Sequence, residues 1–310
     1  MNARTLKGRK GVVALVIGSA LLVGSPLAAW AVTSGHDDPP TVSAKGVTLL
    51  DDKKGSTLYS KDADTVRPLA STVKIMVASV VLDTKNVDLK RKVAVRQQYR
   101  DYVNKRHAST ADLQTGDKVT VRQLLYASLL PSGADAAYAL ADTFGTGDTR
   151  AERITSFITK MNAKAHELHL RKTKYETFDG TGKDSSTPTE LARLARHAMK
   201  DATFRQVVKT KKYKGDAPAA NGGTRTYTWT NTNQLLGAYD GAIGLKTGTT
   251  ARAGKCLVFA ATRGGKTLVG ALMNSDDRFN DAARVLDKGF GSDSAKDLDI
   301  RELPSGGGHG

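Results

Sequence analysis

A run of apolar residues at positions 73–82, broken only by Lys74 and Ser79, constrains the fold of this chain more than any other feature. A helix over this run would be apolar on nearly all sides, and such a helix must be covered by other elements. The chain therefore needs a core around it. With 310 residues, of which 39% are apolar, that core needs no disulfide support. The single cysteine, Cys256, excludes an internal disulfide and a zinc site built from cysteines; we expect it to be a small buried residue in a strand.

Strands are predicted near both ends of the chain, with helices between them. Polar residues and Gly55 separate residues 47–50 from 56–59, which indicates a first hairpin. A second hairpin is predicted where residues 256–261 and 267–273 flank Arg263-Gly264-Gly265-Lys266. Apolar residues at helical spacing predict helices over residues 121–129 and 191–199. This order favours an α+β sheet in which the first and last strands meet.

The first 31 residues have the form of an export signal. Four basic residues precede an uncharged stretch from residue 11 to residue 32, which includes the small-residue sequence Ala29-Trp30-Ala31. This order is typical of a secretory signal peptide cleaved near Ala31. The stretch is also long enough to span a bilayer, so an uncleaved N-terminal membrane anchor is the alternative. Pro26 favours cleavage.

Export affects the meaning of the net charge of +16. Removing residues 1–31 takes away four cations and no acid, which leaves +12. The remaining basic residues are spread along the chain without a helix-turn-helix, zinc-finger or RNA-binding signature. We therefore expect no nucleic-acid partner. A solvated basic surface is one interpretation, and attraction to an anionic cell wall or membrane face is the other.

The mature part of the chain divides into three segments. Residues 32–44 carry His36-Asp37-Asp38-Pro39-Pro40 and are expected to be a linker. No long linker interrupts residues 45–291, which are expected to fold as one domain. Residues 292–310 end in a glycine-rich sequence and are expected to be a disordered tail.

The sequence Ser71-Thr72-Val73-Lys74 stands at the start of the apolar helix. Residues three apart share one face of a helix, so the Lys74 amine can reach the Ser71 hydroxyl. A serine needs a base to become a nucleophile at neutral pH, and a lysine is such a base when its amine is neutral. Burial favours the neutral amine because it lowers the pKa. Alone, this pair is also compatible with an ordinary helix start carrying an exposed lysine.

Two further patterns follow along the chain. Ser132, in Leu130-Pro131-Ser132-Gly133-Ala134, lies in a predicted turn between two helical stretches, where its hydroxyl can face a cleft or simply cap a helix. The sequence Lys246-Thr247-Gly248-Thr249 is predicted on a strand after an Asp240-Gly241 turn. On that strand, Lys246 and Gly248 share one face, and the glycine allows a ligand backbone to approach closely.

Together the three patterns match the motif set of β-lactamases and penicillin-binding proteins. The chain resembles the D-alanyl-D-alanine carboxypeptidases, which are low-molecular-mass penicillin-binding proteins of serine peptidase family S11. The resemblance extends over roughly residues 45–291, including the segments 51–60, 157–165, 173–182 and 231–236. It implies a β-lactamase/transpeptidase-like α+β fold: an antiparallel sheet flanked by helices, with an all-helical subregion that carries the second motif.

The resemblance also implies roles for the motif residues. Ser71 would attack the carbonyl of a D-Ala-D-Ala peptide while Lys74 accepts its proton, and Ser132 would relay a proton toward the leaving D-alanine. Lys246 and Thr247 would hold the region of the substrate carboxylate, beside Gly248. The backbone N–H groups of Ser71 and Thr249 would form the oxyanion hole.

The implied protein is an exported, extracytoplasmic serine D,D-peptidase that needs neither a cofactor nor a metal. Its partners would be a peptidoglycan stem peptide ending in D-Ala-D-Ala and β-lactam antibiotics, which would acylate Ser71. Any membrane attachment would be through the N-terminus. His166 and His169 lie three residues apart but lack a third ligand, so we expect them at the surface or in packing.

One position departs from the family pattern. Where the family has Ser-x-Asn, this chain has Ser132-Gly133-Ala134, so an amide that would contact substrate and position Lys74 is absent. The neighbouring Asp135 is not expected to replace it, because its side chain points elsewhere. Weakened or altered catalysis is therefore expected.

Two other functions remain open from the sequence. A β-lactamase on the same fold would need a glutamate that positions the deacylating water, usually in a Glu-x-x-Leu-Asn sequence. No such sequence is present, and Glu190-Leu191 falls in a predicted helix. A non-catalytic or weakly active penicillin or peptidoglycan binder is the second alternative, which Ala134 favours.

Overall fold

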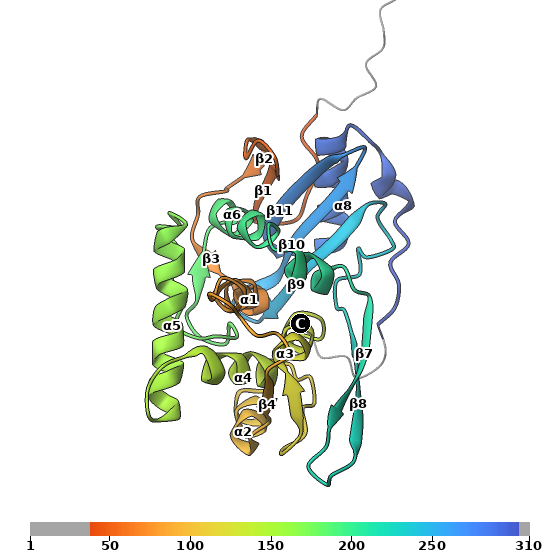
Figure 1. The fold of residues 1–310 in the computed structure, drawn as a ribbon. Helices are drawn as coiled ribbons and strands as arrows, with labels where there is room; N and C mark the ends of the chain where they lie inside the picture. The colour runs from red at the N-terminus through yellow and green to blue at the C-terminus, as the bar shows by residue number, and fades with distance from the viewer. Residues whose placement is uncertain (1–37, 304–310) are drawn as a thin grey trace, which may run out of the picture. The chain divides into compact units, whose positions relative to one another are not determined.

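The computed structural model describes residues 38–303, and a five-stranded antiparallel sheet lies at its centre (Figure 1). The strand order is β2-β1-β11-β10-β9. The strands are β1 (Gly46–Asp51), β2 (Thr57–Lys61), β9 (Ala242–Thr250), β10 (Gly254–Arg263) and β11 (Lys266–Ser275). Both predicted hairpins are present, and the first and last strands pair, with Val47 opposite Leu272. The α+β prediction is confirmed.

Side chains of β10 alternate between the two faces of the sheet, as the two-residue period of a strand requires. Leu257 and Phe259 pack in a cluster with residues of α8 (Arg278–Phe290). Val258 and Ala260 belong to the larger cluster on the other face, which includes residues of α1 (Lys74–Leu82) and α6 (Pro188–Ala198). Cys256 lies in this second cluster and is buried, as predicted.

Helix α1 occupies the middle of the larger cluster. Its residues from Lys74 to Val81 are all buried, and it contacts α3, α4, α5, α6 and α7. The prediction of a helix covered on all sides is confirmed. A short 3₁₀ turn, η1 (Ala70–Val73), precedes it, so Ser71 lies in that turn and Lys74 begins the α-helix.

A helical subregion packs beside α1. It consists of α2 (Gln97–Arg106), α3 (Val121–Leu129), α4 (Ala134–Phe144) and α5 (Arg150–Glu167), with the short strands β4 (Lys92–Ala94) and β5 (Lys118–Thr120). The remaining elements are β3 (Arg67–Pro68), β6 (Ser185–Ser186), α7 (Ala202–Val208), β7 (Lys212–Pro218), β8 (Thr224–Thr230) and η2 (Ser294–Asp297). The loop between α3 and α4 carries Ser132, so the second motif belongs to this helical subregion.

The packed part of the chain extends beyond the limits of 45–291 that the sequence suggests. Val42 and Ala44 are buried, and the Ser43 hydroxyl donates to Asp281 Oδ2 at 2.7 Å, although a linker is expected through residue 44. A disordered tail is expected from residue 292, but Ala295 N–H donates to Asp287 Oδ2 at 2.6 Å, and Arg301 donates to the carbonyl of Asn231. The N-terminal signal or anchor and residues 304–310 lie outside the described residues. In the described part of the chain, no helix is long and apolar enough to cross a bilayer.

Candidate active site

Ser71 and Lys74 face each other at the junction of η1 and α1. The Lys74 amine donates to the Ser71 hydroxyl at 3.0 Å and to the Asp179 carbonyl at 3.1 Å. In a 3₁₀ turn, side chains three residues apart are nearly eclipsed, which brings this pair together more directly than an α-helix would. The amine therefore lies where it can take the hydroxyl proton.

Lys74 is 1% exposed, and this burial lowers the pKa of its amine to about 8. The carboxylates of Asp179, Asp135 and Asp184 act in the opposite direction but do not overcome the loss of hydration. About a tenth of the amines are then neutral at pH 7, against fewer than about one in a thousand for an exposed lysine. Lys74 thus has the electrostatic character of a base.

Two glycines permit close contacts around the Ser71 backbone. Ala70 has a φ of +48°, a conformation that is uncommon for residues other than glycine. A Cβ at Gly180 would overlap the Ala70 carbonyl, and a Cβ at Gly248 would come within 3.1 Å of the Ser71 nitrogen. Strand β9 and the loop at residue 180 therefore contact the turn that holds Ser71 directly. These contacts hold the turn in its unusual backbone conformation.

Ser132 lies in the loop between α3 and α4. It is buried, has a φ of +68°, and its hydroxyl has no hydrogen-bond partner among the described residues. Thr232 joins this loop to β9, because its backbone N–H and its hydroxyl donate to the Leu130 carbonyl at 3.1 and 3.2 Å. The same Thr232 hydroxyl is hydrogen-bonded to the Thr247 hydroxyl at 2.6 Å. A buried hydroxyl without a partner is uncommon and indicates that a ligand can complete its hydrogen bonding.

Lys246 is the second buried lysine of the site. Its amine donates to the carbonyl of Thr247 at 2.9 Å and lies 3.5 Å from the Thr247 hydroxyl. Burial lowers the pKa of this amine well below the usual value, and the nearby charges of Lys74 and Arg278 lower it further. A negative ligand group would reverse this effect, since an opposite charge favours the protonated amine.

Arg278, which the sequence analysis missed, completes the site at the first residue of α8. Its guanidinium donates to the Thr249 hydroxyl at 2.9 Å and to the Gly248 carbonyl at 3.2 Å. Burial lowers its pKa to about 10, so it remains charged at neutral pH. No local motif marks Arg278, because it follows Thr249 by 29 residues. The β10–β11 hairpin between them brings the start of α8 back to the end of β9.

The Asp179-Gly180 pair was also missed. It lies within segment 173–182. Asp179 contributes its backbone carbonyl, which accepts from Lys74, and Gly180 contributes the space that its missing side chain leaves beside the Ala70 carbonyl. A cavity of about 240 Å³ borders this loop and β9; it is lined by Pro68, Gly180, Thr181, Gly182, Lys183, Thr250 and Arg252. The cavity gives a ligand a place beside the Ser71 turn.

The structure explains why Asp135 does not replace the amide that is absent at Ala134. Both oxygens of the buried Asp135 carboxylate are bound by the segment at residues 110–113: it accepts from the N–H groups of Ala111 and Leu113 at 2.9 and 3.0 Å and from the Thr110 hydroxyl at 3.0 Å. Ala134 is fully buried at the start of α4. The expectation that the Asp135 side chain points elsewhere is confirmed.

The Glu190 carboxylate also forms hydrogen bonds within the fold. It lies on α6, as predicted, and its carboxylate accepts from the Thr173 hydroxyl at 2.6 Å and from the Lys172 N–H at 3.0 Å. It serves the fold rather than a deacylating water. Within residues 38–303, no three His, Cys, Asp or Glu side chains are grouped as metal ligands would be.

The fold and this serine–lysine geometry define the class of acyl-serine enzymes that use the β-lactamase/transpeptidase fold. A family model described as D-alanyl-D-alanine carboxypeptidase, Peptidase S11, matches residues 33–277. The chain belongs to this family and is a serine-type D,D-peptidase.

Individual relatives support the same assignment. A D-alanyl-D-alanine carboxypeptidase of Streptomyces sp. strain K15 is 47% identical over 91% of this chain and 98% of its own length. The crystal structure of the Streptomyces K15 DD-transpeptidase matches with a TM-score of 0.81 and 51% identity, covering 82% of this chain and 99% of that one. The carboxypeptidase DacB2 of Mycobacterium tuberculosis is 34% identical over 81% of this chain and 84% of its own length.

Proposed function

We propose that this chain is an exported enzyme that cleaves or transfers the terminal D-Ala-D-Ala bond of peptidoglycan stem peptides through an acyl-enzyme on Ser71. The observation that carries the proposal is the 3.0 Å contact between the Ser71 hydroxyl and the buried Lys74 amine. An ordinary helix start would leave its lysine in water, whereas Lys74 has a lowered pKa and a nucleophile within reach.

The reaction begins with proton transfer from Ser71 to neutral Lys74. The Ser71 oxygen then bonds to the carbonyl carbon of the penultimate D-alanine, and the N–H groups of Ser71 and Thr249 stabilise the resulting oxyanion. The unpartnered hydroxyl of Ser132 passes a proton from Lys74 to the leaving nitrogen as the peptide bond breaks. Free D-alanine departs, and an ester on Ser71 remains. Water or an acceptor amine then breaks that ester and restores the hydroxyl.

Lys246 provides recognition of the negative end of the substrate. The terminal carboxylate of a D-Ala-D-Ala peptide would favour the protonated form of the Lys246 amine, because an opposite charge acts against the burial that lowers its pKa. The charged Arg278, bound to the Thr249 hydroxyl, contributes to the same positive field. A peptide with an amidated end lacks this negative charge and should be recognised less well.

A fluorescent penicillin followed by a diacetylated D-Ala-D-Ala tripeptide tests the proposed reaction. We expect covalent labelling of the wild-type protein, none of Ser71→Ala, and release of D-alanine from the tripeptide. Labelling without release would favour a non-catalytic binder or a strict transpeptidase. Rapid return of opened antibiotic would favour a β-lactamase, and no labelling at all would contradict the proposal.

Ala134 is proposed to limit hydrolysis. An asparagine at this position would supply the substrate hydrogen bond that the family pattern provides, typically about 1 kcal/mol and so about a fivefold gain in turnover. Ala134→Asn and a matched Ala134→Ser variant are compared in the D-alanine release assay. Equal rates for wild type and Ala134→Asn would remove this explanation.

The proposed location is the cell wall or the outer face of the cytoplasmic membrane. The basic, apolar and small-residue order of residues 1–31 supports export, with the folded body beginning near residue 42. Mass measurement of the penicillin-labelled protein from cells gives the mature N-terminus and the number of acyl groups together. A single adduct on a chain beginning near residue 32 is expected; a full-length mass would support the uncleaved anchor.

A further inference from the structure

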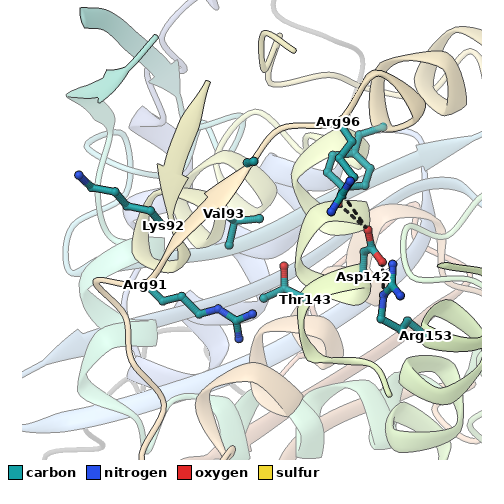
Figure 2. Close-up of a pocket in the computed structure, with 9 residues that line it drawn as sticks. Arg91, Lys92, Val93, Arg96, Asp142, Thr143 and Arg153 are labelled. Carbon is teal, nitrogen blue, oxygen red and sulfur yellow. Dashed lines mark hydrogen bonds and ion pairs between the residues drawn. The ribbon is translucent and has the colours of Figure 1, made fainter. Parts of the chain in front are cut away.

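A second cation-rich region lies at the far end of α4 from the active site. A cavity of about 390 Å³ is lined there by Arg91, Lys92, Val93, Ala94, Arg96, Tyr99, Asp142, Thr143 and Arg153 (Figure 2). The active-site loop with Ser132 meets the N-terminal end of α4, whereas Asp142 lies in its last turn. Asp142 follows Ala134, the first residue of α4, by eight positions, which span about 12 Å along the helix at 1.5 Å per residue. The cavity is therefore separate from the site around Ser71.

Asp142 organises the cationic side chains of this region. Its carboxylate is nearly buried and accepts from Arg153 Nε at 2.6 Å and from the Tyr99 hydroxyl at 2.6 Å. The Arg150 and Arg96 Nε atoms lie 3.5 and 3.9 Å from it. One carboxylate thus holds guanidinium groups that come from α5 and from the start of α2. Such fixed guanidinium groups lose less freedom when they bind a ligand.

The positive charge of this region exceeds the charge of its single acid. Asp142 is the only acidic residue among those that line the cavity, against the cations of Arg91, Lys92, Arg96 and Arg153. Arg91 makes no side-chain ion pair in the described part of the chain. Figure 2 shows its guanidinium directed toward Thr143, while the Lys92 amine points away from the other cations.

Nearby acids do not neutralise this excess. Glu152, on the same helix as Arg153, accepts from the N–H groups of Asp148 and Thr149 at 2.8 and 3.0 Å. The second guanidinium nitrogen of Arg153 donates to the carbonyl of Asp148 at 2.9 Å. Arg153 is therefore mainly a fixed support, and Arg91 and Arg96, which are exposed, are the groups open to a ligand.

We propose that this cavity binds a phosphate group of an anionic polymer or lipid at the cell surface. Guanidinium groups from different elements converge on one space, and a tetrahedral phosphate offers oxygens in several directions to receive them. The cavity is open and much larger than one phosphate, which leaves room for the glycerol or sugar attached to it. The expected net charge of +12 after removal of residues 1–31 would attract such a polyanion from a distance.

Binding at this end of α4 would hold the enzyme near a phosphate-rich surface without occupying the catalytic cleft. The active site would then remain open to stem peptides while the helical subregion contacts the anion. A phosphate polymer and an anionic lipid present the same chemical group, so the assay contains both sources.

The test compares the full folded chain with Arg91→Gln/Arg96→Gln and with the control Lys85→Gln/Lys90→Gln. The control also removes two positive charges, but from exposed lysines that do not line the cavity. The probes are a poly(glycerol phosphate) oligomer, vesicles of phosphatidylglycerol with phosphatidylcholine, and poly-L-glutamate of equal charge. Penicillin labelling of Ser71 is measured in parallel and should be unchanged in all variants.

We expect Arg91→Gln/Arg96→Gln to bind the phosphate probe about tenfold or more weakly, and Lys85→Gln/Lys90→Gln less than about twofold more weakly. A preference for the oligomer or for the vesicles identifies the source of the phosphate, and both results support the site. Equal weakening by Lys85→Gln/Lys90→Gln would show charge attraction without a site and would overturn the proposal. Equal affinity for poly-L-glutamate, or no binding of either phosphate probe, would also overturn it.

Discussion

The regions around Lys74 and Asp142 both contain several basic side chains, but the basic side chains are buried in the first region and partly exposed in the second. The amines of Lys74 and Lys246 are buried and make no salt bridge in the described part of the chain, and both have lowered pKa values. The guanidinium groups around Asp142 are partly exposed and share a carboxylate. Burial without a salt-bridge partner therefore lowers the pKa of an amine, whereas a partly exposed guanidinium beside a carboxylate keeps its charge.

The two regions also differ in residue type: the buried amines belong to lysines, and the partly exposed groups around Asp142 belong to arginines. A lysine can lose its proton within the range that burial reaches, whereas an arginine keeps its charge. Arg278 shows the limit of this effect, because burial lowers its pKa only to about 10. In the proposed mechanism, Lys74 therefore transfers the proton, and the arginines provide fixed positive charge.

Of the substitutions that test this difference, Lys74→Met should have the largest effect on acylation. Loss of the base should slow acylation of Ser71 by penicillin about a thousandfold. Stability should change in the opposite direction. The pKa of Lys74 is about 8 in the folded protein and 10.5 when the side chain is in water. Folding therefore loses stability as the pH falls through this window, and the full penalty remains below pH 8.

Lys74→Met removes that penalty, so we expect its free energy of unfolding to rise by about 1–3 kcal/mol at pH 7. The gain should shrink toward pH 10.5. Urea unfolding at pH 7 and pH 10 measures both effects. Lys85→Met, at an exposed lysine after α1, is the control and should change neither stability nor acylation. A less stable Lys74→Met protein at pH 7 would show that the buried amine supports the fold.

Replacing Asp142 by asparagine should destabilise the other region. Removing the charge from a nearly buried carboxylate that binds Arg153 and Tyr99 should cost about 3 kcal/mol, because the guanidinium groups would be left to repel one another. Denaturant unfolding measures this loss, and penicillin labelling of the folded variant should persist. Asp112→Asn removes an exposed partner of Arg100 and should cost less than about 0.5 kcal/mol. Equal stability of the two variants would mean that Asp142 is not an organiser.

The pH dependence of acylation sharpens the assignment of Lys74 as a base. With a pKa of about 8, the neutral amine becomes about fifty times more abundant between pH 6 and pH 8 and then levels off near pH 9. The second-order rate constant for penicillin labelling should follow this curve upward. A flat profile, or a rate that falls over this range, would indicate that the amine acts only as a cation. Phosphate binding at the cavity beside Asp142 should show no such rise, because the groups proposed to bind phosphate are the guanidinium groups of Arg91 and Arg96.

Much of the fold is predictable because its signals are local. The apolar run at residues 73–82 predicts the central helix, and α3 begins and ends at the predicted residues Val121 and Leu129. The Gly264-Gly265 turn predicts the β10–β11 hairpin, since both residues adopt positive φ. The three motifs also identify the segments that the structure brings together, because each motif carries its own chemistry.

The other contributors to the site are not visible locally. Asp179 acts through its backbone carbonyl, which any residue type possesses, and Arg278 reaches Thr249 only after the sheet has formed. The ordered segment after residue 291 is also hidden, because the glycine-rich end dominates the composition there. Arg301 and Ala295 nevertheless make specific hydrogen bonds in this segment. Long-range contacts of this kind depend on packing rather than on spacing.

The pairing of β1 with β11 has a consequence for how the chain matures. Val47 finds its partner Leu272 only after more than two hundred further residues have been made or translocated. Until then β1 lacks that neighbour, and the turn that holds Ser71 lacks β9 until residues 242–250 have been made. A growing chain therefore cannot assemble the surroundings of Ser71 until most of its sequence has been made. The same delay leaves apolar strands exposed to solvent for longer. We therefore expect chaperones to bind the unfinished chain.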